Sequence, residues 1–172
     1  MDLVVSHGND RWTARWAGES HPCAVGRSGV VAAAEKREGD GASPAGAWPM
    51  RRLLYRADRL AQPETGLPVA AIAEDDGWCD DPQDGAYNQP VQFPYAASHE
   101  RLWRDDEIYD LIVVLGHNDA PVRPGQGSAI FLHCARPGFT PTEGCVALAP
   151  ETLLRLLAGA KPGDRVVIEE GP

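Results

Sequence analysis

A histidine and a cysteine twelve positions apart are the residues of this chain best suited to covalent chemistry. His133 directly follows the short apolar run Ala129–Leu132. Cys145 follows Gly144 and directly precedes a second apolar run. A thiolate is a strong nucleophile, and a nearby imidazolium raises its population near neutral pH. Because Gly144 lets the backbone approach a substrate closely, the amides of Gly144 and Cys145 are candidates for an oxyanion hole. The pair predicts nucleophilic catalysis, and the alternative is a chance pairing with an inert, buried cysteine.

Short strands are expected to carry these two residues. Ala129–Leu132 is apolar and partly β-branched or aromatic, which predicts a buried strand with His133 at the point where it leaves the core. Tyr109–Gly116 gives the strongest strand signal and is apolar enough to lie centrally in a sheet. Further strands are expected at Leu3–Val5, Arg11–Ala17, Cys23–Gly26, Trp48–Tyr55, Val69–Ile72 and Arg165–Glu169.

Two stretches favour short helices. Ser98–Glu107 begins with a possible N-cap and places Leu102 and Trp103 on its inner side. Pro150–Leu157 begins with Pro and Glu, which is typical of a first helical turn. The sequence therefore predicts a mainly β fold with one or two helices, and hydrophobic periodicity alone does not separate a sandwich from a small barrel.

The length and charge of the chain limit its class and its partners. With 172 residues and 43% hydrophobic residues, we expect a single domain over residues 1–172. The net charge of -9 argues against binding to nucleic acid or to an anionic membrane. No apolar run has the length of a membrane span, and the first residues do not resemble a signal peptide. We expect a cytoplasmic protein if Met1 is the true start, and a periplasmic one if a signal peptide has been removed or missed.

The cysteines and acidic residues do not predict a metal site. Cys23, Cys79, Cys134 and Cys145 form no CxxC pair and have no zinc-ligand spacing. The acid-rich stretch 75–82 lacks the ordered spacing of a calcium loop. We therefore expect free thiols and no bound metal.

Two segments of the chain resemble the L,D-transpeptidase catalytic domain (YkuD-like) family. The active-site signature of that family is a His followed by Ser or Thr, any residue, Gly, Cys and an aliphatic residue, and Thr142–Val146 fits this pattern behind His133. Upstream, Asp40–Trp48 is similar to the family segment Thr-Pro-x-Gly-x-Phe, with Ser and Trp replacing the Thr and the Phe. The resemblance covers nearly the whole chain, and the short spacing between His133 and Cys145 suggests a compact subgroup.

This resemblance implies a fold, a reaction and a substrate class. The fold is a β-sandwich-like catalytic domain in which Cys145 is the nucleophile and His133 the base. The substrates are peptidoglycan stem peptides or muropeptides, attacked at the bond between the L-centre of a diamino acid and a terminal D-Ala. The resulting thioester passes to an amine in an L,D-transpeptidase or to water in an L,D-carboxypeptidase, without a cofactor. The alternatives are a noncatalytic peptidoglycan-binding module and an unrelated cysteine peptidase or thiol enzyme.

The residues that contact the substrate are less well defined by the sequence. Ala147 stands where the family often has a substrate-binding Arg. Arg136 or Arg123 is expected to replace it, and the alternative for either is a solvated surface side chain. Thr142 of the signature is also expected to contact the substrate. The sequence makes no prediction of the oligomeric state, the acceptor or the diamino acid.

Two other places are candidate walls of the cleft. His117 and Asn118 follow the predicted central strand, where polar residues often line a pocket, and they are expected to orient substrate or support His133. The alternative is a turn whose hydrogen bonds are satisfied within the protein. Trp78 and Tyr87 lie in the long irregular stretch 61–94, and either flank the cleft or pack in the core.

Overall fold

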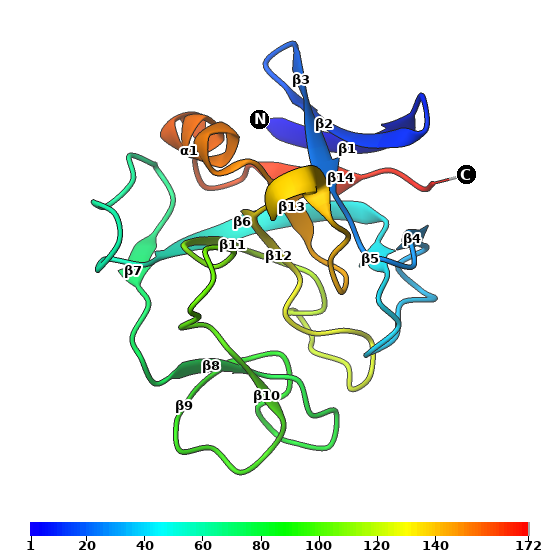
Figure 1. Ribbon diagram of the computed structural model, residues 1–172. Coiled ribbons are helices and arrows are strands. Elements are labelled where there is room, and N and C mark those ends of the chain that lie inside the picture. The colour runs from blue at the N-terminus through cyan, green and yellow to red at the C-terminus, as the bar shows by residue number, and fades with distance from the viewer. Residues whose placement is uncertain (172) are drawn as a thin grey trace.

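The computed structural model describes residues 1–171 as a mainly β protein (Figure 1). It contains a nine-stranded sheet, a three-stranded sheet and a two-stranded ribbon. The strands are β1 (Asp2–Gly8), β2 (Arg11–Trp16), β3 (Glu19–Ala24), β4 (Val30–Val31), β5 (Ser43–Pro44), β6 (Gly46–Tyr55), β7 (Val69–Ala71), β8 (Asp76–Cys79), β9 (Pro90–Gln92), β10 (His99–Arg101), β11 (Leu111–Leu115), β12 (Phe131–Cys134), β13 (Val146–Leu148) and β14 (Arg165–Ile168). A 3-10 turn, η1 (Pro137–Phe139), precedes the cysteine loop, and α1 (Pro150–Gly159) follows it.

The large sheet closes on itself through its longest strand. Its order is β11-β12-β13-β3-β2-β1-β14-β6-β7, and β6 also pairs with β11. Strand β6 makes hydrogen bonds on both of its sides. The Met50 amide donates to the Asp164 carbonyl, beside β14, and the Pro49 carbonyl accepts from the Gly116 amide, beside β11. The strand pairing therefore returns to its starting point, and the strands surround a common interior.

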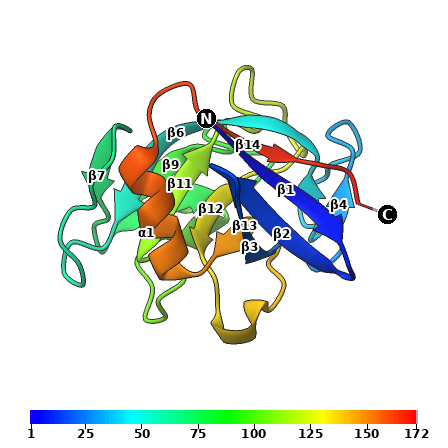
Figure 2. The same ribbon diagram turned by 90° about the horizontal axis from the view of Figure 1, so that it is seen from above.

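That interior is the main hydrophobic core. It takes inward-facing residues from all the long strands, such as Leu3 of β1 and Leu132 of β12. The helix α1 adds Leu153, Leu156 and Leu157, whose spacing of three and one places them on one face. Figure 2 shows α1 lying beside the strands β11, β12 and β13. The helix predicted at Pro150–Leu157 is thus confirmed and continues for two further residues.

A second hydrophobic cluster lies on the opposite face of β11 and β12. It includes Trp78, Leu102, Tyr109, Phe131 and Cys145. The small sheet β10-β8-β9 packs over this cluster, and Figure 1 shows these three strands grouped on the side of the molecule away from β1, β2 and β3. Because side chains alternate along a strand, Phe131 and His133 face this side while Leu132 and Cys134 face the main core.

Two predictions about local structure were wrong. The helix expected at Ser98–Glu107 does not form, because His99–Arg101 is the strand β10, in antiparallel register with Cys79–Gly77 of β8. The sheet ladder satisfies the backbone there, and Leu102 is buried against the second cluster. The strand expected from Ala129 begins instead at Phe131, since Ala129 has a left-handed backbone with φ of 51°. The other predicted strands are present, with ends shifted by a few residues.

Candidate active site

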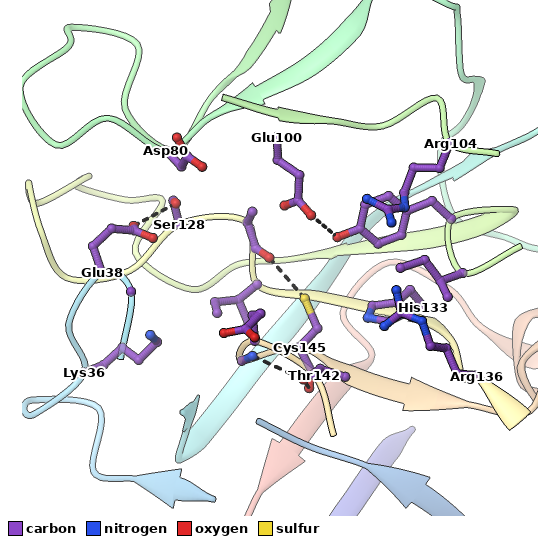
Figure 3. A pocket seen from close by; sticks show the side chains of 17 residues that line it. Lys36, Glu38, Asp80, Glu100, Arg104, Ser128, His133, Arg136, Thr142 and Cys145 are labelled. Carbon is purple, nitrogen blue, oxygen red and sulfur yellow. Dashed lines mark hydrogen bonds between the residues drawn. The ribbon is translucent and has the colours of Figure 1, made fainter. Parts of the chain in front are cut away.

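A pocket of about 530 Å³ lies between strands β12 and β13 and the small sheet (Figure 3). Both residues predicted to be catalytic line it. Its walls come from widely separated parts of the chain, so that charged groups from four regions surround the thiol. The lining residues are Lys36, Glu38, Gly39, Asp80, Glu100, Arg104, Ile108, Tyr109, Ser128, Ala129, Ile130, His133, Arg136, Thr142, Glu143, Gly144 and Cys145.

The thiol of Cys145 is held by two backbone groups. Strands β12 and β13 run parallel with Leu132 opposite Val146, which brings Cys145 next to Phe131. The sulfur accepts a hydrogen bond from the Phe131 amide at 3.4 Å and donates to the Ala129 carbonyl at 3.2 Å. The left-handed turn at Ala129 thus supplies the acceptor for the thiol proton.

The imidazole of His133 is fixed by a backbone carbonyl. Its Nδ1 lies 2.9 Å from the Cys134 carbonyl oxygen, which can only accept, so we assign the ring proton to Nδ1. This leaves Nε2 unprotonated and able to accept a proton. The ring of Tyr109 packs edge-on against His133, with centroids 5.3 Å apart and planes at 80°. His133 lies inside β12 and is buried, rather than emerging beyond the strand as predicted.

Burial keeps both members of the pair neutral. It lowers the pKa of His133 to about 4, against the opposing effect of the bond to the Cys134 carbonyl. Burial also raises the pKa of Cys145 to about 12, and the charge of Glu100 acts in the same direction. The resting pair is therefore a thiol and a neutral imidazole that line the same pocket, and the thiol donates its proton to the Ala129 carbonyl.

The signature threonine shapes the loop before Cys145. The hydroxyl of Thr142 donates to the Cys145 carbonyl at 2.7 Å and accepts from the Gly144 amide at 3.1 Å. Gly144 has φ of 139°, and a Cβ there would lie 2.9 Å from the Ala42 carbonyl oxygen. Since the Gly144 amide already has a partner, Cys145 provides the better placed amide for an oxyanion. The role of both amides as an oxyanion hole stays a prediction.

Of the predicted substrate-binding residues, two line the pocket. Thr142 does so, and so does Arg136, whose side chain is 48% exposed and contacts Asp106 at 3.3 Å. Arg123 lies outside the pocket, where its backbone bonds to Asn118. Arg136 is therefore the better placed replacement for the family arginine.

His117 and Asn118 lie outside the pocket and organise the loop that leads to it. The His117 ring packs on Trp48 at 4.7 Å, and its Nε2 contacts the Gln126 carbonyl at 3.0 Å. Asn118 donates to the Arg123 and Gly127 carbonyls. These contacts favour a structural turn over direct substrate contact or support of His133, although the buried Nδ1 of His117 has no hydrogen-bond partner in residues 1–171.

Trp78 and Tyr87 are both buried and do not line the pocket. Trp78 packs edge-on against Phe131 at 5.1 Å, which favours the core interpretation, and its indole donates to Asn88 at 3.0 Å. The Tyr87 hydroxyl donates to Glu38 at 2.5 Å. Tyr87 thus acts on the pocket through a lining residue.

Most of the charged residues that line the pocket could not be predicted from a local sequence pattern. The cationic side chains that line the pocket are paired with acids that do not line it. Lys36 pairs with Asp40 at 2.5 Å, and both Arg104 and Arg136 pair with Asp106. Of the acids that line the pocket, Glu143 pairs with Arg27 at 2.9 Å. The other three, Glu38, Asp80 and Glu100, form no ion pair within residues 1–171. These residues belong to separate loops and to β10, so no local motif brings them together.

Other features of the chain bear on metals and membranes. In residues 1–171 no three His, Cys, Asp or Glu side chains are grouped as metal ligands. The four cysteines are buried and unpaired. No helix in this described part is long and apolar enough to cross a membrane.

The fold and the pocket agree with a comparison to known families. The family described as the L,D-transpeptidase catalytic domain (YkuD) matches residues 3–168. The chain therefore belongs to this family, and the resemblance of the two sequence segments is confirmed. Membership implies an enzyme-type catalytic domain with a peptidoglycan substrate. A search of curated proteins found no match.

Proposed function

We propose that this protein is a cysteine acyltransferase or hydrolase of peptidoglycan stem peptides. It cleaves the bond between the L-centre of a diamino acid and a terminal D-Ala through a thioester on Cys145. The observation that carries the proposal is that the Cys145 thiol and the His133 imidazole, whose Nε2 is unprotonated, line the same pocket. A noncatalytic binding module has no need of such a pair.

The proposed reaction follows from the neutral pair. His133 Nε2 removes the thiol proton while the sulfur attacks the carbonyl carbon of the scissile bond, and the Cys145 amide stabilises the oxyanion. Collapse of the tetrahedral intermediate breaks the C–N bond, and the imidazolium returns its proton to the amine of the leaving D-Ala. An amine or water, deprotonated by the same imidazole, then attacks the thioester and releases the thiol. Arg136 and Thr142 are proposed to contact the substrate.

Product analysis tests this proposal. The protein is incubated with a muropeptide tetrapeptide, with and without an added D-amino acid, and the products are read by mass spectrometry. Release of D-Ala alone identifies an L,D-carboxypeptidase, and exchange or dimer formation identifies an L,D-transpeptidase. A thioester adduct on Cys145 is expected in either case. A protein that leaves the tetrapeptide intact but cleaves an L,L-peptide would instead be an unrelated cysteine peptidase.

A further inference from the structure

Glu100 is a pocket residue that is linked to the catalytic pair through its contact with Tyr109. It lies at the centre of β10, opposite Trp78 of β8, and its side chain extends into the pocket between those of Asp80 and Arg104 (Figure 3). The small sheet therefore delivers a carboxylate to the space above Cys145. No step of the proposed reaction uses it.

A direct chain of contacts joins Glu100 to His133. The Tyr109 hydroxyl donates to the Glu100 carboxylate at 2.5 Å, and the Tyr109 ring packs edge-on against the His133 ring. The same tyrosine also packs against Phe131, whose amide bonds to the Cys145 sulfur. An aromatic ring anchored at its hydroxyl end restricts the plane of the imidazole it touches.

Burial raises the pKa of Glu100, and the groups that face its carboxylate neutralise it poorly. Asp80 and Glu38 repel it, and Arg104 attracts it while bound to Asp106 through two hydrogen bonds. Lys36, the other cation near the sulfur, is paired with Asp40. Burial and the Glu100 charge both raise the pKa of Cys145, whereas Lys36 and the Phe131 amide lower it.

We propose that Glu100 is a positioning residue for the catalytic pair, which anchors the Tyr109 ring against His133 and places a carboxylate in the same pocket as the Cys145 thiol. This inference rests on the proposed roles of Cys145 and His133. It assigns the small sheet a part in catalysis, because that sheet supplies the anchor. A substrate group that neutralises the carboxylate would relieve its effect on the sulfur.

Thiol alkylation tests the charge without any substrate. Labelling of Cys145 by iodoacetamide is followed by peptide mass spectrometry across a pH series in the wild type and in Glu100→Gln, which keeps an acceptor for Tyr109 but removes the charge. We expect the labelling midpoint of the variant to fall by about one pH unit, or the rate at fixed pH to rise about tenfold. Asp75→Asn, an exposed acid before the small sheet, is the matched control and should label as the wild type does. An unchanged midpoint in Glu100→Gln overturns the charge effect.

A second variant tests the anchor. Tyr109→Phe keeps the ring but loses the bond to Glu100, so kcat for D-Ala release should fall at least tenfold while KM changes little. Its alkylation midpoint should not fall, because the charge remains. An unchanged kcat overturns the anchor. If Glu100→Gln does not fold, the wild type still decides, since a Cys145 labelling midpoint at or below that of an ordinary cysteine contradicts the proposal. Failure of these tests leaves the thioester test of the proposed function unaffected.

Discussion

The hydroxyl of Ser43 donates to the Gly144 carbonyl at 2.8 Å, across 101 positions of the sequence. It also accepts from the Gly26 amide at 2.9 Å and lies 3.3 Å from the Cys145 carbonyl. Ser43 is fully buried, so this single hydroxyl ties β5 and the β3–β4 connection to the loop that carries Cys145. The contact gives a physical reason for two separated segments of the sequence to share one family pattern.

Ser43→Ala should therefore weaken both the fold and the reaction. It leaves buried backbone groups without a partner, which costs about 1–3 kcal/mol of unfolding free energy. Urea denaturation and D-Ala release measure the two effects. Ser28→Ala, at an exposed serine of the same region, should change stability by less than about 0.5 kcal/mol. Equal stability of the two variants would show that the Ser43 bridge contributes little.

Cys145→Ala should abolish turnover and leave the fold intact. The substitution removes the sulfur but no buried charge, since burial holds the group as a thiol. Mass spectrometry should detect no thioester, and the circular dichroism spectrum should match that of the wild type. Residual D-Ala release by a correctly folded Cys145→Ala protein would exclude this residue as the nucleophile.

The pH dependence of kcat/KM should show the lowered pKa of His133. As pH falls, Nε2 gains a proton and can no longer act as a base, so the rate is lost as pH passes through the folded-state pKa. The acidic limb should have its midpoint near pH 4 rather than near the ordinary value of 6.5. His133→Gln should lower the rate roughly 10²–10⁴-fold, whereas His7→Gln, at an exposed histidine, should not alter the profile. A limb that stays at the ordinary histidine value would move the base to another group.

Access rather than ionisation should select the cysteine that is alkylated first. Burial raises the pKa of both Cys134 and Cys145 to about 12, so neither is favoured by its thiolate population. Cys145 lines the pocket, whereas Cys134 faces the main core and is 1% exposed. Iodoacetamide should label Cys145 first, at a rate that rises with pH. Faster labelling of Cys134 in peptide mapping would contradict this arrangement.

Asn88→Ala should disturb the pocket from a distance. The buried Asn88 amide accepts from Trp78 and Ala129 and donates to the carbonyls of His117 and Asn118. Losing it should reduce the unfolding free energy by at least about 1–3 kcal/mol and displace the Ala129 carbonyl that holds the thiol. Thermal unfolding and the alkylation rate of Cys145 measure these effects. The neighbouring exposed Gln89→Ala should leave both unchanged.

The parts of the fold with strong local patterns could be predicted from the sequence. The central strand near Leu111–Leu115 and the helix from Pro150 depend on continuous apolar runs and on helix-start residues, and both are present. The stretch Ser98–Glu107 has comparable helix signals, but pairing of His99–Arg101 with β8 is a tertiary effect that no local signal records. The left-handed Ala129 likewise depends on Asn88, a residue far away in the sequence.

The candidate site was predictable only where its residues are adjacent in the sequence. His133 and Cys145 stand in one short signature, so their residue types and order predict a catalytic pair, and both residues line the pocket. The acids Glu38, Asp80 and Glu100 come from three separate segments, and their proximity follows from how the small sheet packs on the large one. The pKa values of His133 and Cys145 could not be predicted from the sequence, because they depend on burial and not on residue type.

Within residues 1–171, the strands of the small sheet β10-β8-β9 pair only with one another, while β12 and β13 belong to the large sheet. The wall of the pocket and the strands that position Cys145 and His133 are thus built by separate hydrogen-bonded units that meet through side chains. Exchange of the small sheet between family members, with the packing residues Trp78 and Leu102 retained, offers a route to hybrid enzymes. In such hybrids the small sheet, and with it the choice of substrate, would change, whereas Cys145 and His133 would stay the same.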